Sequence, residues 1–191
     1  EDGCHDVDVP RSWTRNEDCG DWDYSIYTNT QMPWQEGDNP SVPQAPTNYN
    51  PVGFYRKEFT VKPSMLQDNG RVLISFQGVE SAYYVYVNGH EVGYSEDSYR
   101  PHEFDITDYL NPQGEVNTLA VKVHKFCDGT WMEDQDMIYD GGIFRDVYLY
   151  STPLVHISDY RVITDLDETY TNADLQLSPV VTNYATQDVS N

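Results

Sequence analysis

Basic residues are scarce in this chain. Its 191 residues include 11 Lys and Arg against 32 Asp and Glu, which gives a formal net charge of −21. A field of that sign repels phosphate backbones and anionic bilayers. Long apolar runs are also missing, because none approaches the roughly 18 residues that a membrane-spanning helix requires. We therefore expect no nucleic-acid partner and no association with a membrane.

Cysteine is rare as well. Cys4, Cys19 and Cys127 match neither Cys-x-x-Cys pairs nor the cysteine framework of a small secreted protein. We predict reduced thiols in a cytoplasmic protein, and a Cys4–Cys19 bridge is the alternative that the spacing leaves open. No Asn-x-Ser/Thr sequence with a permitted middle residue occurs, so the sequence has no acceptor for N-glycosylation. This absence also favours a cytoplasmic location.

Complete motifs for metal or nucleophilic chemistry are absent from the sequence. Asp134, Asp136 and Asp140 begin a calcium loop, but Ile138 and Arg145 occupy two positions where that loop needs oxygen ligands. No glycine-rich phosphate loop occurs. Because carboxylates are so abundant here, spacing alone nominates no pair as general acid and base. We therefore assign no catalytic residue to this chain.

What the sequence has in abundance is short runs of β-branched and aromatic residues. They are bounded by Asn, Gly, Asp or Pro, as strands usually are. Asn88-Gly89 separates two of them and supplies the positive φ angles of a type I′ hairpin turn. Helical signals amount to about one turn at 64–68 and another at 106–110. The predicted strands are 54–62, 71–76, 82–87, 90–95, 118–126 and 144–150.

This pattern predicts an antiparallel sandwich or jelly roll, because short strands without intervening helices do not build parallel α/β folds. The first fifty residues have no sustained period and read as irregular chain laid over the strands. Near Ser151-Thr152-Pro153 a boundary is expected, followed by strands at 154–166 and 173–181. Two strands cannot form a stable domain alone, so we expect them to begin a second β module.

Aromatic residues make up 14% of the chain. Sugar rings present an apolar face and a polar rim, so aromatic side chains beside Asp or Asn are typical of saccharide sites. The alternative is that the aromatics are core residues and that the Asp and Asn residues form turns. The candidates are Trp22, Tyr24, Tyr27, Trp34 and Trp131, next to Asp21, Asp23, Asn29, Asp128, Asp134 and Asp136.

A collinear series of motifs resembles the N-terminal part of the β-galactosidases of glycoside hydrolase family 2. The resemblance extends over about residues 9–165. In chain order the motifs are IYTN at 26–29, NPVGFYRKEF at 50–59, SFQGVESAYYVYVNGHEVGYSEDS at 75–98, PHEFDITDYL at 101–110, NTLAVKV at 117–123, DGTWMEDQDM at 128–137 and GIFRDVYLY at 142–150.

The resemblance implies an all-β chain, with a galactose-binding-like jelly-roll domain at 1–152 and the first strands of an immunoglobulin-like sandwich at 153–191. It implies a fragment of a retaining β-galactosidase that hydrolyses terminal β-galactosides such as lactose. The two catalytic glutamates of the family reside in a later (β/α)₈ barrel, and the full enzyme is expected to be a homo-oligomer. The alternatives are a stand-alone carbohydrate-binding module and a β-glucuronidase-like relative.

The resemblance also assigns residue roles. Asn29 matches an asparagine that contacts the galactosyl group, and Asp136 matches an aspartate that ligates sodium and touches the galactose 6-hydroxyl. Magnesium is left open for other parts of the enzyme. Asn88 and Asp97 are expected to be turn and scaffold residues. Residues 138–141 depart from the family pattern, which leaves the shape of that loop open.

Overall fold

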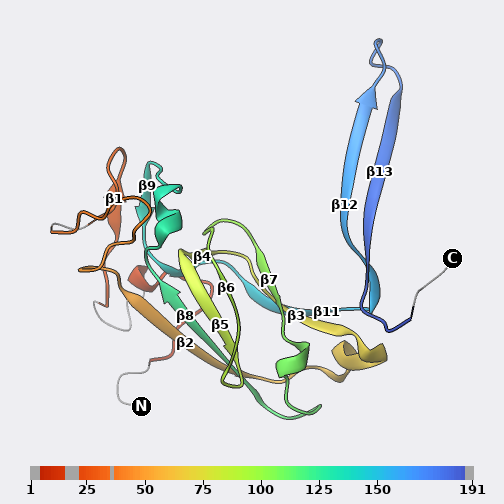
Figure 1. The fold of residues 1–191 in the computed structure, drawn as a ribbon, viewed down its shortest axis with the longest axis horizontal. Coiled ribbons are helices and arrows are strands. Elements are labelled where there is room, and N and C mark those ends of the chain that lie inside the picture. The colour runs from red at the N-terminus through yellow and green to blue at the C-terminus, as the bar shows by residue number, and fades with distance from the viewer. Residues whose placement is uncertain (1–4, 16–21, 35–36, 188–191) are drawn as a thin grey trace.

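The structure, a computed structural model, describes residues 5–15, 22–34 and 37–187 (Figure 1). Cys4, Cys19 and Asp21 lie outside the described residues, so the choice between reduced and bridged cysteines there stays open. Cys127 is a free, buried cysteine. The described chain is all-β apart from short 3₁₀ turns, which confirms the predicted fold class.

Two antiparallel sheets form the body of the domain. The larger has the order β2-β8-β5-β6 and the smaller the order β11-β3-β7, and each joins strands that are distant in sequence. The larger sheet contains β2 (Val52–Phe59), β8 (Asn117–His124), β5 (Ala82–Val87) and β6 (His90–Ser95). The smaller contains β11 (Val147–Thr152), β3 (Arg71–Phe76) and β7 (His102–Asp105), while β4 (Val79–Glu80) pairs with β10 (Gly142–Ile143).

One hydrophobic core joins the two sheets. Successive side chains of a strand point to opposite faces, so alternate residues of the central strands are buried. Each fully buried aliphatic or aromatic side chain contributes about 1.5–3 kcal/mol relative to exposure. The buried residues of these strands include Val72, Ile74, Phe76, Tyr83, Val85, Val87, Val121 and Val123.

The turns follow the predicted chemistry. Asn88 and Gly89 have φ angles of 52° and 83°, as a type I′ hairpin between β5 and β6 requires. The expected helical turns are the 3₁₀ helices η2 (Pro63–Asn69) and η3 (Thr107–Tyr109). Two more 3₁₀ turns, η1 (Trp13–Arg15) and η4 (Asp128–Trp131), flank the region that holds the candidate site.

The N-terminal segment crosses one end of the sandwich as mostly irregular chain. The indole ring of Trp13, which belongs to this segment, is buried in the main core. The Trp13 backbone N–H donates to the Gly141 carbonyl at 3.1 Å. The segment contains one strand, β1 (Ile26–Thr28), which pairs with β9 (Met137–Tyr139). The sequence pattern did not reveal these three-residue strands.

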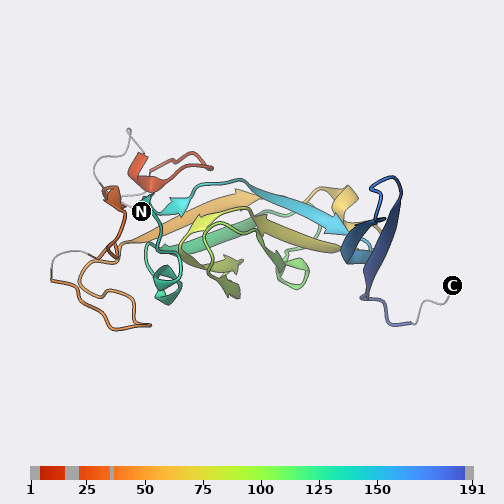
Figure 2. The same cartoon turned by 90° about the horizontal axis from the view of Figure 1, so that it is seen from above.

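A long hairpin projects from the opposite end of the sandwich (Figures 1 and 2). It consists of β12 (Val155–Leu166) and β13 (Ala173–Asn183), which pair with each other. Most of its side chains are exposed, and the register places Val162 opposite Leu177 on one apolar face. The division into domains at residues 152 and 153 stays a prediction. Within the described residues, no helix is long and apolar enough to cross a membrane.

Candidate functional site

The short β1·β9 ladder brings the two predicted site residues together. Its last pair is Thr28 opposite Met137. Asn29 follows Thr28 and Asp136 precedes Met137, so Asn29 and Asp136 are the next residues of the same antiparallel register. Both side chains are exposed. The structure therefore places two residues from distant motifs directly beyond the same end of the ladder.

Tyr27 belongs to the same group. Its hydroxyl donates to Asp136 Oδ1 at 2.9 Å, and its ring is 63% exposed. This hydrogen bond and the negative charge of Asp136 raise the pKa of Tyr27. The bond fixes one carboxylate oxygen, while Oδ2 of Asp136 accepts no hydrogen bond from the described residues. Asn29 Oδ1 accepts from the Thr30 hydroxyl at 3.3 Å.

These donors fit a hard cation such as sodium. Hard cations prefer oxygen ligands, and this end of the ladder offers the Asp136 carboxylate and the Asn29 amide oxygen. Two side chains do not complete the coordination shell of an ion, so any further ligands would come from other parts of the protein or from the ligand itself. The same two groups can accept or donate hydrogen bonds to sugar hydroxyls.

Behind the ladder lies a buried ion pair that sequence reasoning missed. Lys125 Nζ is 2.7 Å from Asp23 Oδ2, and the two side chains are 0% and 2% exposed. Lys125 also donates to the Tyr24 carbonyl at 2.7 Å. Asp23 accepts in addition from Trp13 Nε1 at 2.6 Å and from the Tyr49 hydroxyl. This network ties the segment that leads into β1 to the end of β8.

The aromatic candidates divide into three groups. Trp34 packs edge-on against Trp131 and Phe126, with ring centroids 5.2 and 5.4 Å apart, so these rings act as a small core. Tyr24 stacks on Tyr49 beside Asp23, and these three residues and Trp22 line a hollow of about 450 Å³. Of the aromatic candidates in the described chain, only Tyr27 has a hydrogen bond to a predicted site residue. Asn29 and Asp136 do not line the hollow, so the aromatic candidates do not gather around the two predicted sugar contacts.

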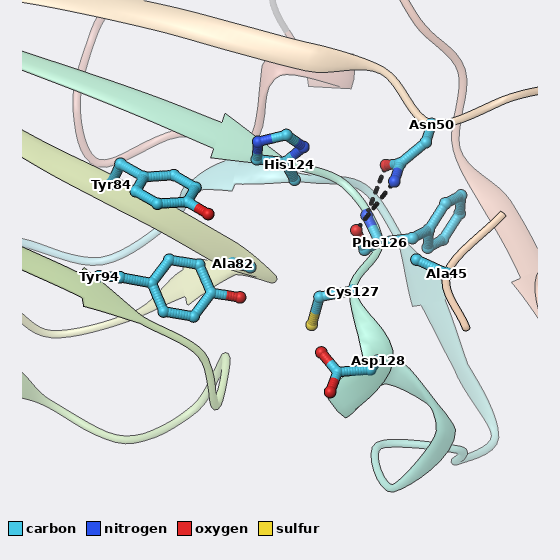
Figure 3. Close-up of a pocket in the computed structure, with 9 residues that line it drawn as sticks. All are labelled: Ala45, Asn50, Ala82, Tyr84, Tyr94, His124, Phe126, Cys127 and Asp128. Carbon is cyan, nitrogen blue, oxygen red and sulfur yellow. Dashed lines mark hydrogen bonds between the residues drawn. The ribbon is translucent and has the colours of Figure 1, made fainter. Parts of the chain in front are cut away.

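A surface hollow of about 250 Å³ lies on the outer face of the larger sheet, near η4 (Figure 3). Tyr84 and Tyr94 line it from β5 and β6, and Cys127 and Asp128 line it from the N-cap and first residue of η4. Asn50 closes one side through two 3.0 Å hydrogen bonds with the Phe126 backbone. Neither Asn29 nor Asp136 lines this hollow.

At its edge, single oxygen or sulfur atoms of Glu96, Cys127 and Asp128 lie within 4.8 Å of one another. Burial raises the pKa of the Cys127 thiol, and the Ser81 hydroxyl donates to its sulfur at 3.4 Å. Burial therefore favours the neutral thiol over the thiolate at this position. No spacing pattern in the sequence marks this group, because Glu96 is distant in sequence from Cys127 and Asp128.

Asn88 and Asp97 are scaffold residues, as predicted. The Asn88 side chain donates to the Tyr109 carbonyl at 2.8 Å and accepts from the Thr118 N–H at 2.9 Å. Asp97 has a φ of 74° and lies 3.8 Å from Arg100 Nε. Both residues shape turns away from the β1·β9 ladder.

Comparison with known proteins identifies the family. The profile described as "Glycosyl hydrolases family 2, sugar binding domain" matches residues 2–153. The chain belongs to this family. The expected resemblance is thereby confirmed, and the jelly-roll sandwich described above is its sugar-binding domain.

Two relatives named "Beta-galactosidase" are identical to the chain at about half of the matched positions. The protein from Priestia megaterium is 51% identical over 182 residues, which is 95% of this chain and 17% of the relative. The protein from Clostridium acetobutylicum is 50% identical over 154 residues, 81% of this chain and 17% of that relative. The chain thus spans about one sixth of the length of these relatives.

Solved structures agree on the fold. The crystal structure of a Bacteroides uniformis β-glucuronidase superposes with a TM-score of 0.63 at 26% identity, covering 72% of this chain and 17% of that one. The fold is therefore shared with an enzyme named for a different sugar, and it does not by itself select the substrate.

Proposed function

We propose that this chain is the sugar-binding part of a β-galactosidase that hydrolyses terminal β-galactosides such as lactose with retention of configuration. The observation that carries the proposal is that Asn29 and Asp136 directly flank the Thr28–Met137 pair, which ends the β1·β9 ladder. Retaining hydrolysis needs two carboxyl groups about 5–5.5 Å apart across the scissile bond. These belong to the (β/α)₈ barrel that the family resemblance implies.

Asn29 and Asp136 bind and orient the galactosyl group in this proposal. Asp136 accepts a hydrogen bond from the 6-hydroxyl, and Tyr27 holds the carboxylate in place. Sodium, held in part by Asp136, would supply a positive charge for the sugar oxygens. No side chain here acts as acid, base or nucleophile. The contribution to rate is positioning, which counts when it is stronger in the transition state.

The exposure of Asn29 and Asp136 favours half a site over a complete lectin site. A freestanding module must enclose its sugar well enough to offset the ordering cost of a small polar ligand. Two exposed polar side chains do not, whereas a second domain facing them would complete a pocket. This supports an enzyme component over an independent carbohydrate-binding module.

Charge favours a galactoside over a glucuronide. A glucuronide carries a carboxylate at the position of the galactose 6-hydroxyl, and Asp136 would repel it in a chain with a net charge of −21. The relatives at about 50% identity are named β-galactosidases, whereas the β-glucuronidase structure is 26% identical. The β-glucuronidase alternative is therefore the weaker one.

Remaining domains of the same enzyme are the proposed partners, in a cytoplasmic homo-oligomer. The β12·β13 hairpin supports the presence of a further domain, because Tyr160, Val162 and Leu166 share one exposed face with Leu175 and Leu177. An amphipathic two-stranded hairpin is marginal alone and gains stability by burying such a face. We propose that the rest of an immunoglobulin-like sandwich covers it.

The test is the Asp136→Asn variant of the full-length protein, assayed with a nitrophenyl β-galactoside across a sodium titration at constant ionic strength. The amide keeps the shape of the carboxylate and loses its charge. The fall in kcat/KM should correspond to a loss of about 2–4 kcal/mol of transition-state stabilisation, and kcat/KM should depend less on the sodium concentration. Asp134→Asn, an exposed neighbour, is the matched control and should behave as wild type. Wild-type efficiency and sodium dependence in the Asp136 variant would remove Asp136 from the site.

A further inference from the structure

The β1·β9 ladder is too short to hold its own position. It has three residue pairs, and isolated two-stranded pairings are marginal even when longer. Yet a binding group must be held to within about half an ångström, which requires supporting contacts. Those contacts should lie at the end of the ladder opposite Asn29 and Asp136.

Asp140 lies at that opposite end. The first pair of the ladder is Ile26 with Tyr139, so Ser25 and Asp140 are the flanking residues of the register. The Ser25 hydroxyl donates to Asp140 Oδ1. The Thr14 hydroxyl donates to the same oxygen at 2.7 Å, and Arg15 Nε lies 3.4 Å from Oδ2. Asp140 thus links η1 and the residue before β1 to the end of β9.

These contacts keep Asp140 charged. Burial alone would raise the pKa of its carboxyl, but hydrogen bonds from Ser25 and Thr14 and the charge of Arg15 outweigh burial and lower it. A charged acceptor forms stronger hydrogen bonds than a neutral one. The fastening is therefore present throughout the neutral pH range.

Glu80 connects this fastening to the sandwich. It lies on β4 and is 6% exposed. Its Oε2 accepts the backbone N–H of Gly141 at 3.0 Å and that of Asp140 at 3.3 Å. Oε1 is buried and has no hydrogen-bond partner in the described chain. A carboxyl group buried with one oxygen unpartnered is informative, because an apolar side chain would fill the space with a smaller desolvation penalty.

Glu80 is surrounded by groups from several elements. Lys125 beyond β8 attracts its charge, whereas Asp140 beyond β9 repels it. Tyr99 and Tyr139 also face it closely enough for Glu80 to raise the pKa of both hydroxyls. Glu80 is therefore fixed among the loops that carry the ladder and does not point into solvent.

We infer that Glu80 and Asp140 are positioning residues for the galactoside contacts of Asn29 and Asp136. Glu80 holds the backbone of the 140–141 turn from β4, which directly precedes β5 of the larger sheet, and Asp140 fastens β1 beside β9. Together they determine the position of the end of the ladder that Asn29 and Asp136 flank. This inference rests on the proposed β-galactosidase function, and it assigns these two residues a role in recognising the hydroxymethyl group of the sugar.

The readout is sugar discrimination by the full-length enzyme. A nitrophenyl α-L-arabinopyranoside lacks the hydroxymethyl group of the matching β-galactoside. If the ladder shifts, kcat/KM for the galactoside should fall about tenfold in Glu80→Ala and in Asp140→Ala, while the arabinoside loses less than about twofold. Glu80→Gln keeps one acceptor oxygen and should restore most of the galactoside preference.

Asp105→Ala is the matched control. Asp105 also accepts from a hydroxyl, that of Thr107 at 2.6 Å, and pairs with an arginine, Arg71, at 2.6 Å, but it lies beside η3. Its removal should cost stability and leave the sugar preference unchanged. In an Asp136→Asn background, Glu80→Ala should no longer change the preference, because the contact it positions is gone.

Outcomes separate the two proposals. A full-length wild type that does not hydrolyse the galactoside refutes the proposed function. An active wild type whose preference is unchanged in the alanine variants overturns the positioning roles, as does an equal loss on both sugars. If Glu80→Ala does not fold, Asp140→Ala together with Asp140→Asn decides: an unchanged preference in both refutes the inference, and a reduced preference in Asp140→Ala supports it.

Discussion

Replacing Lys125 by Met removes one charge from the most deeply buried ion pair of the described chain. Methionine matches the length of the apolar stem, so packing changes little. The substitution leaves the buried carboxylate of Asp23, which is 2% exposed, without its cation. It also leaves the Tyr24 carbonyl without the hydrogen bond that Lys125 donates. Breaking a buried pair by removing one partner costs about 3–5 kcal/mol.

Contacts in the structure place the loss at the lower end of that range. Asp23 keeps two donors, Trp13 Nε1 at 2.6 Å and the Tyr49 hydroxyl. Nearby rings of Tyr24 and Tyr49, 5.7 and 6.0 Å from Nζ, lose a weak cation–π attraction. We expect a loss of about 3 kcal/mol, and a melting temperature lower by about 6–12 °C for a protein of this size.

Urea unfolding of the 191-residue chain, followed by tryptophan fluorescence and circular dichroism, measures this loss. The matched control is Lys122→Met, whose Nζ lies 5.7 Å from the Tyr84 ring on a partly exposed face. It should cost less than about 1 kcal/mol. Adding Asp23→Asn to Lys125→Met should recover part of the loss, because the unpaired charge disappears. A loss below about 1 kcal/mol for Lys125→Met would refute the importance of this pair.

Three further predictions concern pH, backbone and activity. Burial raises the pKa of Glu80 from 4.5 to about 7. Protonated Glu80 therefore stabilises the fold fully below pH 4.5, and this stabilisation is lost as pH rises through 7. Glu80→Gln should remove about 3 kcal/mol of this pH dependence of the unfolding free energy, measured from pH 4 to 8. Gly141→Ala should cost at least about 2 kcal/mol in the same assay, because φ is +81° and the new Cβ would lie 2.5 Å from the Trp13 ring; a change below half of that would show that the turn relaxes. The isolated chain should not hydrolyse nitrophenyl β-galactosides, since it matches no motif for the two required carboxyls; turnover that survives purification and is blocked by a galactose-based inhibitor would contradict this.

Strands of the sandwich were predictable because their signal is local. The β3, β5 and β6 strands have the predicted bounds, since β-branched alternation and turn residues such as Asn88-Gly89 act within a few residues. β11 begins and ends later than predicted, at Val147–Thr152 in place of 144–150. Strand ends depend on which partner backbone is available, and that is a tertiary property.

The short strands β1, β4, β7, β9 and β10 were not predicted. Three residues such as Ile26–Thr28 carry no period, and they become a strand only because Met137–Tyr139 lies beside them. Asn29 and Asp136 were identified from their motifs, but their adjacency and the supporting contacts of Glu80 and Asp140 depend on this pairing. The same holds for Lys125 and Asp23, which no pattern connects.

The amino-acid sequence alone indicates the all-β class, the main strands and the family, because alternation, turn chemistry and motif order are written along the chain. Its motifs also nominate Asn29 and Asp136 as candidate sugar contacts. Tertiary structure alone decided which carboxylates are buried, which are paired and which face solvent. Neither charge nor spacing distinguishes Asp23, Glu80, Asp136 and Asp140 among the 32 acidic residues, and of these four only Asp136 stands in a motif that assigns it a role. Their surroundings make one an ion-pair partner, two of them structural acceptors and one a candidate ligand, since burial and the nearest donors set the state and the use of a carboxyl group.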